Sequence, residues 1–413
     1  ESPLEGDVAG PDRAADPGPS PDEPGAGADL VLGPVGGPGF QFRLRLELVD
    51  EVVAGAAVEP GYLHSGLDKL AESLGYHQLP SVLERVAGPD PVAAGLAVVL
   101  AAEALLGVEV PPRARRLRIL CAEISRLQSH LSWLVRQARA AGFDQAAAVA
   151  ADVAEAVADL SQGLTGRRAP FDVLRVGGVT IDAPDGLASA VSVCLAEVRA
   201  GLRQVRGLWL ASRAWQRRVQ GRAVLGAGEA AAWGVTGPAL RAAGIGEDVR
   251  RSRPYGGYEE LDFEVAAGAS GDLADRCGVR VAEMEQGACI LEQVSADLPA
   301  GPVAVDDARI SPPAPGPGRT SAESVIHHAE LWMSGHGLRP TAGARVYLPV
   351  EGAGGERAVY LVSDGTACPH RLHLRSPSLM HAQVMPRLLI GLALDEVVPA
   401  AVSLDVCAAE MDR

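Results

Sequence analysis

Helical patterns dominate residues 91–220, and this stretch restricts the possible folds more than any other feature of the chain. Within it, apolar residues recur at the three- and four-residue spacing of a half-buried helix, with charged residues on the other face. Pro111-Pro112 separates two of these helices because proline ends a helix. So many alanine-faced helices predict close packing in a bundle, with long members at residues 119–138, 144–160 and about 187–218.

Two segments before this region alternate in the manner of strands. Residues 40–48 place apolar and polar side chains in turn, as in a strand that is buried on one face. Residues 52–58 are expected to pair with them in a small antiparallel sheet. A short helix is expected to follow at residues 65–75.

The C-terminal third mixes helices and strands. Residues 344–349 and 358–362 are strand-like and flank a glycine-rich turn, which predicts a hairpin. The other segments expected here are helices at 272–298, 322–334 and 377–398, and an irregular proline-rich connection at 302–320. The chain is therefore predicted to be α+β and mainly helical, with a small N-terminal antiparallel sheet and a C-terminal α/β part.

The first 29 residues differ in composition from the rest of the chain. They hold eight acidic residues against one arginine and are rich in proline, glycine and alanine, which predicts a disordered acidic tail. Composition alone favours a solvated extension without function. The predicted division of the chain is this tail at 1–29, an N-terminal sheet at 30–62, a helical core at 63–300, a proline-rich connection at 301–320 and a C-terminal α/β part at 321–413.

The overall charge and hydropathy limit the classes of partner. The net charge is −15, whereas nucleic-acid binding needs clustered Lys and Arg, so we expect no nucleic-acid partner. The longest apolar run, near residues 92–102, is shorter than the roughly 20 residues that span a bilayer. The acidic start also lacks the apolar stretch of a secretory signal.

The six cysteines are scattered, and no two of them stand three residues apart. In a chain without an export signal, such cysteines are expected to be reduced thiols. A chain that bound its own iron–sulfur cluster or nickel ion would usually carry Cys-x-x-Cys pairs. We therefore expect this chain to hold no metal, and any cluster to belong to a partner.

Several short motifs follow one another in the order in which they occur in one protein family. They are Gly61-Tyr62-Leu63-His64, Pro111-Pro112-Arg113-Ala114, Glu123-Ile124-x-Arg126-Leu127-x-x-His130, Arg175-Val176-Gly177-Gly178-Val179, Pro254-Tyr255-Gly256-Gly257-Tyr258-Glu259 and Glu410-Met411-Asp412-Arg413. Each motif is weak alone, but the ordered set runs from about residue 33 to the last residue. On these motifs the chain resembles the D subunit of complex I, the NADH-quinone oxidoreductase, as a divergent member of that hydrogenase-large-subunit-like family.

The resemblance implies a fold, partners and an activity. The fold would be that of the large subunit of nickel–iron hydrogenases without the nickel–iron site. The partners would be the B, C and H subunits of complex I, of which B carries the terminal iron–sulfur cluster and H lies in the membrane. Quinone is reduced between the D and B subunits in the family. The chain would therefore be part of an enzyme that takes quinone as substrate, would bind no flavin or nicotinamide, and would lie peripherally on the cytoplasmic side of the cell membrane.

The departures from the family gather at the positions that it uses for quinone and the cluster. There the family has histidine, tyrosine, aspartate or arginine, and the matching positions here are residues 33–40, Ser65, Gly88, Gln137, Ala140 and Pro170. Quinone reduction takes two electrons and two protons, and a His–Asp pair and a Tyr hydroxyl suit the delivery of protons. Glycine and alanine supply neither a proton nor a side-chain hydrogen bond. The standard quinone chemistry is therefore expected to be absent or rebuilt.

Four residues are candidates to face the quinone or the partner's cluster, and none is predicted to be catalytic. His64 lies in the best-matched motif, and a packed structural histidine is the alternative. Arg126 and His130 are four apart and share a helix face, either at the interface with the B subunit or in an internal polar network. Arg175 precedes two glycines and either holds a loop against a partner or is an exposed turn residue.

Two functions stay open at this point. One is a working D subunit with a rebuilt quinone cavity. The other is a scaffold paralogue in a complex I-like assembly that lacks standard quinone chemistry. The missing Cys-x-x-Cys pairs argue against an active nickel–iron hydrogenase.

Overall fold

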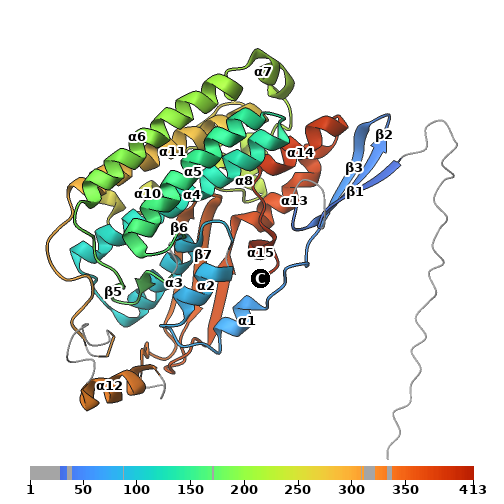
Figure 1. Ribbon diagram of the computed structural model, residues 1–413. Helices are drawn as coiled ribbons and strands as arrows, with labels where there is room; N and C mark the ends of the chain where they lie inside the picture. The colour runs from blue at the N-terminus through green and yellow to red at the C-terminus, as the bar shows by residue number, and fades with distance from the viewer. Residues whose placement is uncertain are drawn as a thin grey trace, which may run out of the picture.

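The computed structural model describes residues 28–34, 40–86, 88–169, 172–307, 309–310, 321–332 and 337–413. This part of the chain is α+β and mainly helical, as predicted, with small antiparallel sheets (Figure 1). The predicted tail up to residue 27, Pro170 and residues 311–320 of the proline-rich connection lie outside the described residues. No helix in the described ranges is both long and apolar enough to cross a membrane.

A bundle of four long helices forms the largest core. Its members are α4 (Pro112–Ala140), α5 (Asp144–Thr165), α6 (Leu187–Val205) and α11 (Leu273–Ala296). Both α4 and α6 pack against α5 and α11. α4 begins at Pro112, where proline fits the first helical turn. The buried faces are leucine, valine and alanine, as the periodicity predicts, so the predicted bundle is confirmed.

The prediction of a single helix at 187–218 is wrong. α6 ends at Val205, a π-helical turn η1 (Arg206–Leu210) follows, and α7 (Arg213–Val219) starts afresh. The break lets Trp209 and Trp215 both face the core, where their ring centroids lie 5.2 Å apart and about 6 Å from that of Phe143. A straight helix could not present two tryptophans six residues apart to one partner, because that spacing turns them far apart around the axis.

The N-terminal sheet has three strands instead of the two predicted. β1 (Ala28–Leu32), β2 (Arg43–Val49) and β3 (Val52–Glu59) pair antiparallel in this order. The period-two pattern of β2 buries Leu44 and Leu46 in a second core with α13 (Pro377–Leu389) and α14 (Leu394–Ser403), which confirms the predicted strands. β1 is short and half-exposed, so it lacks the alternation that marks β2.

A second three-stranded sheet packs on the helix α3 (Pro91–Leu106). Its strands β6 (Arg345–Gly352) and β7 (Gly355–Val362) form the predicted hairpin, and β8 (Arg371–Arg375) adds a third strand. Their inner faces join α3 in the third core. The short helices α1 (Leu67–Ala71), α2 (Leu79–Val86) and α15 (Ala408–Met411) surround this layer (Figure 1).

The helix predicted at 377–398 is also two helices. Residues 391–393 leave the helical path because they pair with the start of β3: the amide of Val53 donates to the carbonyl of Leu392 at 2.9 Å. The remaining elements are short, apart from α12, and comprise β4 (Leu174–Arg175), β5 (Gly178–Val179), α8 (Ala227–Ala232), α9 (Pro238–Ala242), α10 (Val249–Ser252), η2 (Tyr258–Glu260) and α12 (Ala322–Trp332).

Candidate functional site

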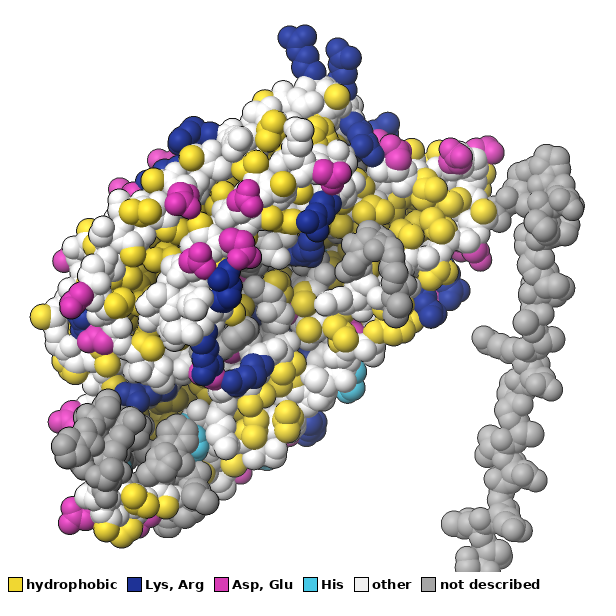
Figure 2. All heavy atoms as spheres, viewed as in Figure 1, with side chains coloured by type: hydrophobic (Ala, Val, Ile, Leu, Met, Phe, Trp, Pro, Cys, Tyr) yellow, Lys and Arg dark blue, Asp and Glu magenta, His cyan; other side chains and the backbone are white. Residues whose placement is uncertain are grey.

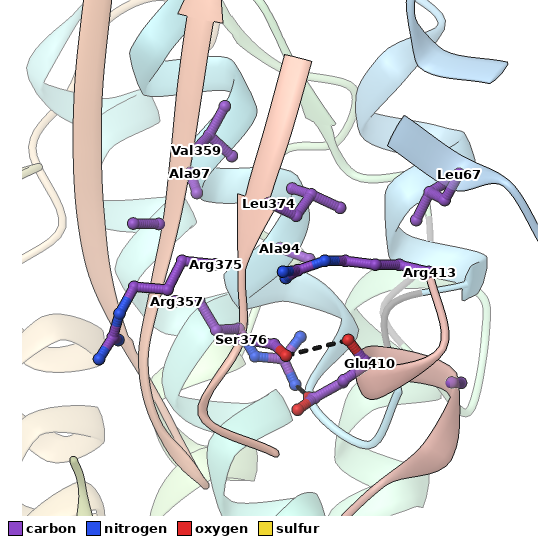
Figure 3. Close-up of a pocket in the computed structure, with 12 residues that line it drawn as sticks. Leu67, Ala94, Ala97, Arg357, Val359, Leu374, Arg375, Ser376, Glu410 and Arg413 are labelled. Atoms are coloured by element: carbon purple, nitrogen blue, oxygen red, sulfur yellow. Dashed lines mark hydrogen bonds and ion pairs between the residues drawn. The ribbon is translucent and has the colours of Figure 1, made fainter. Parts of the chain in front are cut away.

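A small cavity, here called the C-terminal pocket, lies where α1, α3, the second sheet and the chain end meet (Figure 3). The space inside it has a volume of about 30 Å³, enough for one or two water molecules and far below the roughly 300–1,000 Å³ of ligand sites, so a ring-sized ligand would have to displace the side chains around it. Its walls are mostly apolar. The lining residues are Leu67, Ala94, Ala97, Arg357, Ala358, Val359, Leu374, Arg375, Ser376, Ala409, Glu410 and Arg413.

A buried ion pair forms the polar side of this pocket. Arg357 on β7 pairs with Glu410 on α15, and both side chains are almost fully buried. The other carboxylate oxygen of Glu410 accepts a hydrogen bond from the Ser378 hydroxyl at 2.6 Å, and Ser376 Oγ donates to the Glu410 carbonyl at 2.9 Å. Burial lowers the pKa of Arg357 by disfavouring its charge. Glu410 is thus fully engaged and is not free to exchange protons with a ligand.

Arg413 is the cation that remains available in this pocket. Its side chain runs across the pocket toward the strand that carries Leu374 (Figure 3). Its Nη1 is buried and has no hydrogen-bond partner within the described ranges. Arg375 turns elsewhere and donates to the carbonyl of Glu356 at 2.9 Å. A guanidinium always carries several donors, so Arg413 offers a positive hydrogen-bond donor to whatever enters.

Gly88, at the position where the resemblance places a tyrosine, has no room for a side chain. Its φ is +87°, which favours glycine, and an added Cβ would lie 2.9 Å from both Cys407 Sγ and Glu410 Cγ. Cys407 is also 3.9 Å from Gln41 Oε1, in the connection between β1 and β2. The C-terminal residues therefore occupy the space that a tyrosine from position 88 would need.

His64 lies against the same end of the chain. Its side chain is exposed, and its Nδ1 is 2.7 Å from the Asp412 carbonyl, to which it must donate. The amide of Leu63 donates to Asp412 Oδ2 at 2.9 Å. Ser65 is exposed beside this contact. The first family motif, Gly61-Tyr62-Leu63-His64, and the last, Glu410-Met411-Asp412-Arg413, thus meet next to the pocket.

Arg126 and His130 lie inside the protein, in a network of charged side chains between α4, α11 and β6. Arg126 Nη2 donates to the Glu351 carbonyl at 2.8 Å. His130 Nε2 is 3.3 Å from a carboxylate oxygen of Glu283, and Arg280 is 3.4 Å from its Nδ1. Burial lowers the pKa of His130 and so favours the neutral ring. Neither side chain reaches the surface of this chain.

Arg175 lies apart from the other three candidates, at the end of β4, where it pairs with Gly178 of β5. Its carbonyl accepts a hydrogen bond from Arg118 at 2.9 Å, and Arg118 also forms a buried two-bonded ion pair with Glu103. None of the four candidates lines the C-terminal pocket, and only His64 contacts the chain end beside it, through the Asp412 carbonyl. The prediction that these four residues face quinone or a cluster stays a prediction.

Two other altered positions have structural partners. Gln137 is buried and donates to the Pro399 carbonyl at 3.0 Å. Ala140 is partly buried against the second core. Neither residue offers an acid or base. In residues 33–40, an added Cβ on Gly33 would overlap the Phe42 carbonyl, and residues 35–39 lie outside the described ranges.

The sequence did not single out Arg357 or Ser376. A signal for Arg357 exists, because this arginine occupies an inward-facing position of a strand whose other inward positions are apolar. A buried arginine in such a pattern requires a buried carboxylate, which Glu410 provides.

Comparisons with known proteins agree on one family. A family model described as the 49 kDa subunit of respiratory-chain NADH dehydrogenase matches residues 142–413. The D subunit of the NADH-quinone oxidoreductase of Geotalea uraniireducens (strain Rf4) is 36% identical over 372 residues, which are 90% of this chain and 95% of that protein. The D subunit of Methylacidiphilum infernorum (isolate V4) is 36% identical over 372 residues, 90% of this chain and 88% of that protein. The D 2 subunit of Chloroflexus aurantiacus is 36% identical over 375 residues, 90% of each chain.

Proposed function

The chain belongs to the D-subunit family of NADH-quinone oxidoreductases, and from this premise we propose that its C-terminal pocket receives the head of a quinone. As a member of this family it is a subunit of an oxidoreductase complex. The observation that carries the proposal is the unpartnered Nη1 of Arg413 inside a pocket with apolar walls. A quinone ring is apolar, and its carbonyl oxygens accept hydrogen bonds.

Arg413 would bind the ligand and stabilise charge. Leu67, Val359 and Leu374 would contact the ring, and the Arg413 guanidinium would donate to one carbonyl oxygen. Negative charge grows on that oxygen as electrons arrive, and a nearby cation stabilises it. The guanidinium does not give up a proton near neutral pH. Both protons of the quinol would therefore come from water or from another group than Arg413.

The electrons would come from an iron–sulfur cluster on the B subunit, and this chain would bind no cofactor itself. The exposed segment beside His64 supports such docking, because Tyr62 and Leu63 are both more than 40% exposed and lie next to the pocket. Neighbouring exposed apolar side chains favour an interaction surface when they form a contiguous patch. The C and H subunits would be further partners, and the assembly would place the chain on the cytoplasmic side of the membrane with a hydrogenase-large-subunit-like fold.

One observation favours the second candidate, a scaffold paralogue without standard quinone chemistry. Cys407 and Glu410 fill the space beside Gly88, and Gln137 and Ala140 are packed without acid–base groups. In this case the pocket would be a remnant of the fold, and the assembly contacts would be the retained function.

NADH:quinone reductase activity separates the two functions. The assay uses membranes from cells in which this chain is the sole D subunit, with an artificial electron acceptor as a measure of upstream electron flow. Inhibitor-sensitive quinone reduction that Arg413→Ala weakens supports the rebuilt site. An assembled complex that reduces the artificial acceptor but no quinone supports the scaffold.

A further inference from the structure

The region around η1 and α7 carries a strong local positive charge. Residues 198–228 contain seven arginines and no aspartate or glutamate, in a chain whose net charge is −15. Basic side chains project from the end of the molecule that α7 forms (Figure 2, with α7 labelled in Figure 1). This end of the molecule therefore differs in charge from the chain as a whole.

Four of these arginines are neutralised within the chain. Arg199 pairs with Glu292 and Arg206 with Glu285, both on α11, and Arg218 and Arg222 pair with Asp395 and Glu396 on α14 at 3.1 Å each. The other three, here called the arginine surface, are exposed and make no ion pair or side-chain hydrogen bond with any described residue. They are Arg203, Arg213 and Arg217.

The acidic N-terminal segment leaves the folded part close to this surface. Ala28, the first described residue, pairs with Leu48 beside the turn between β2 and β3. In that turn the Glu51 carbonyl accepts a hydrogen bond from the Leu394 amide at 3.0 Å. Leu394 starts α14, whose next two residues, Asp395 and Glu396, pair with arginines of the basic stretch. An unbroken series of contacts thus links the exit of the segment to the neighbourhood of the arginine surface.

We propose that residues 1–27 of this chain dock on the arginine surface. The segment holds seven carboxylates and one arginine, so its charge complements three unpaired guanidinium groups. Fully extended, its 27 residues could reach on the order of 90 Å, far more than the route described above requires. Weak exposed ion pairs are enough to hold a covalently attached segment on the surface, because a short linker gives the segment an effective concentration in the millimolar range.

A broad anionic surface, such as a lipid membrane, fits this site less well. The exposed carboxylates Asp50 and Glu51 flank the approach from the sheet side and would repel it. The chain's own segment avoids this repulsion, because residues 24–27, which adjoin Ala28, carry no charge. The local arrangement of charge therefore favours the chain's own segment as the occupant.

Photo-crosslinking in the assembled complex tests the proposal. A benzophenone side chain is introduced at Ser20 of the full chain, and the cross-linked peptides are identified by mass spectrometry after illumination. The expected product joins residue 20 to residues 203–222. Its yield should fall roughly tenfold or more in the variant R203E/R213E/R217E, since three exposed pairs are lost together. It should also fall at 1 M salt, which screens exposed charges.

Two further variants make the result specific. Arg345→Glu changes an exposed arginine on β6 that makes no ion pair with a described residue, and it should leave the yield unchanged. Lysine at Asp7, Asp12, Asp16, Asp22 and Glu23 should restore the cross-link in the charge-reversed background, which a misfolded variant could not do. A product with another protein of the complex, or a yield that is insensitive to charge reversal, overturns the proposal.

Discussion

The Nδ1 of His64 lies 2.7 Å from the carbonyl oxygen of Asp412, so a segment near the start of the fold is held against its last residues. The Leu63 amide adds a second hydrogen bond to the Asp412 carboxylate. Arg413 follows directly and extends into the C-terminal pocket (Figure 3). The position of the proposed quinone ligand therefore depends on contacts that join both ends of the folded part.

Arg413→Gln is expected to lower kcat/KM for quinone by about tenfold or more, with a higher KM and a lower kcat, because the guanidinium both binds the quinone and stabilises the charge that develops on it. The variant removes a charge-assisted hydrogen bond, which contributes roughly 1.5–3 kcal/mol. Initial rates at varied quinone concentration measure the effect, and Arg345→Gln on the exposed face of β6 is the matched control. An unchanged kcat/KM in Arg413→Gln contradicts the assignment of this arginine to the ligand.

Gly88→Ala is expected to lower the free energy of unfolding by about 2–4 kcal/mol. Part of the loss comes from the positive φ and part from overlap with Cys407 and Glu410. Gly142→Ala separates the two effects, because Gly142 has a φ of +82° and open space around an added Cβ. Denaturant titration measures both variants. Equal losses in the two variants would show that the space beside Cys407 and Glu410 accommodates a Cβ at position 88.

Regular periodicity made much of the fold predictable. The long faces of α4 and α5 and the alternation in β2 and β7 follow from local pattern, because one side of each element meets a core. The breaks after Val205 and Leu389 were not predictable. They arise from contacts distant in sequence, namely tryptophans packing on Phe143 and residues 391–393 pairing with β3.

The candidate site was predictable only at the level of motifs. The sequence drew attention to His64 and to the final Glu410-Met411-Asp412-Arg413, and the structure brings them together. It did not indicate that Arg357 pairs with Glu410, since ion-pair partners 53 residues apart leave no local pattern. Arg126 and His130 share a helix face as expected, but only the tertiary structure shows that this face is internal.

Arg357→Met is expected to destabilise the protein by about 3–5 kcal/mol, because it leaves Glu410 charged and buried without its cation. The double variant R357M/E410L should cost less than the sum of the two single variants, since no unpaired charge remains. A double-mutant cycle from denaturant titrations measures the coupling. Additive losses would show that the two charges do not stabilise each other.

Glu84 on α2 is expected to make stability fall as pH rises. Burial raises the pKa of its carboxyl from 4.5 to about 8, although a hydrogen bond from the Asp172 amide opposes the shift. Its Oε1 is buried and has no hydrogen-bond partner among the described residues. The folded protein therefore keeps this proton between about pH 4.5 and 8, whereas the unfolded chain releases it. In this window the free energy of unfolding should decrease by up to about 1.4 kcal/mol per pH unit.

Glu84→Gln removes this titration and retains an oxygen that can accept from the Asp172 amide. The variant should gain stability over the unmodified protein as pH rises from 5 to 8. Below pH 4.5 and above pH 8, Glu84 has the same charge in the folded and unfolded states, so the two plots of unfolding free energy against pH should run parallel there. Denaturant titrations across this range measure the difference. Glu197→Gln, at an exposed carboxylate on α6, controls for the loss of one negative charge. If the difference in unfolding free energy between the variant and the unmodified protein stays constant from pH 5 to 8, Glu84 is already ionised in the folded protein. Neighbouring groups would then compensate the desolvation of its buried carboxylate.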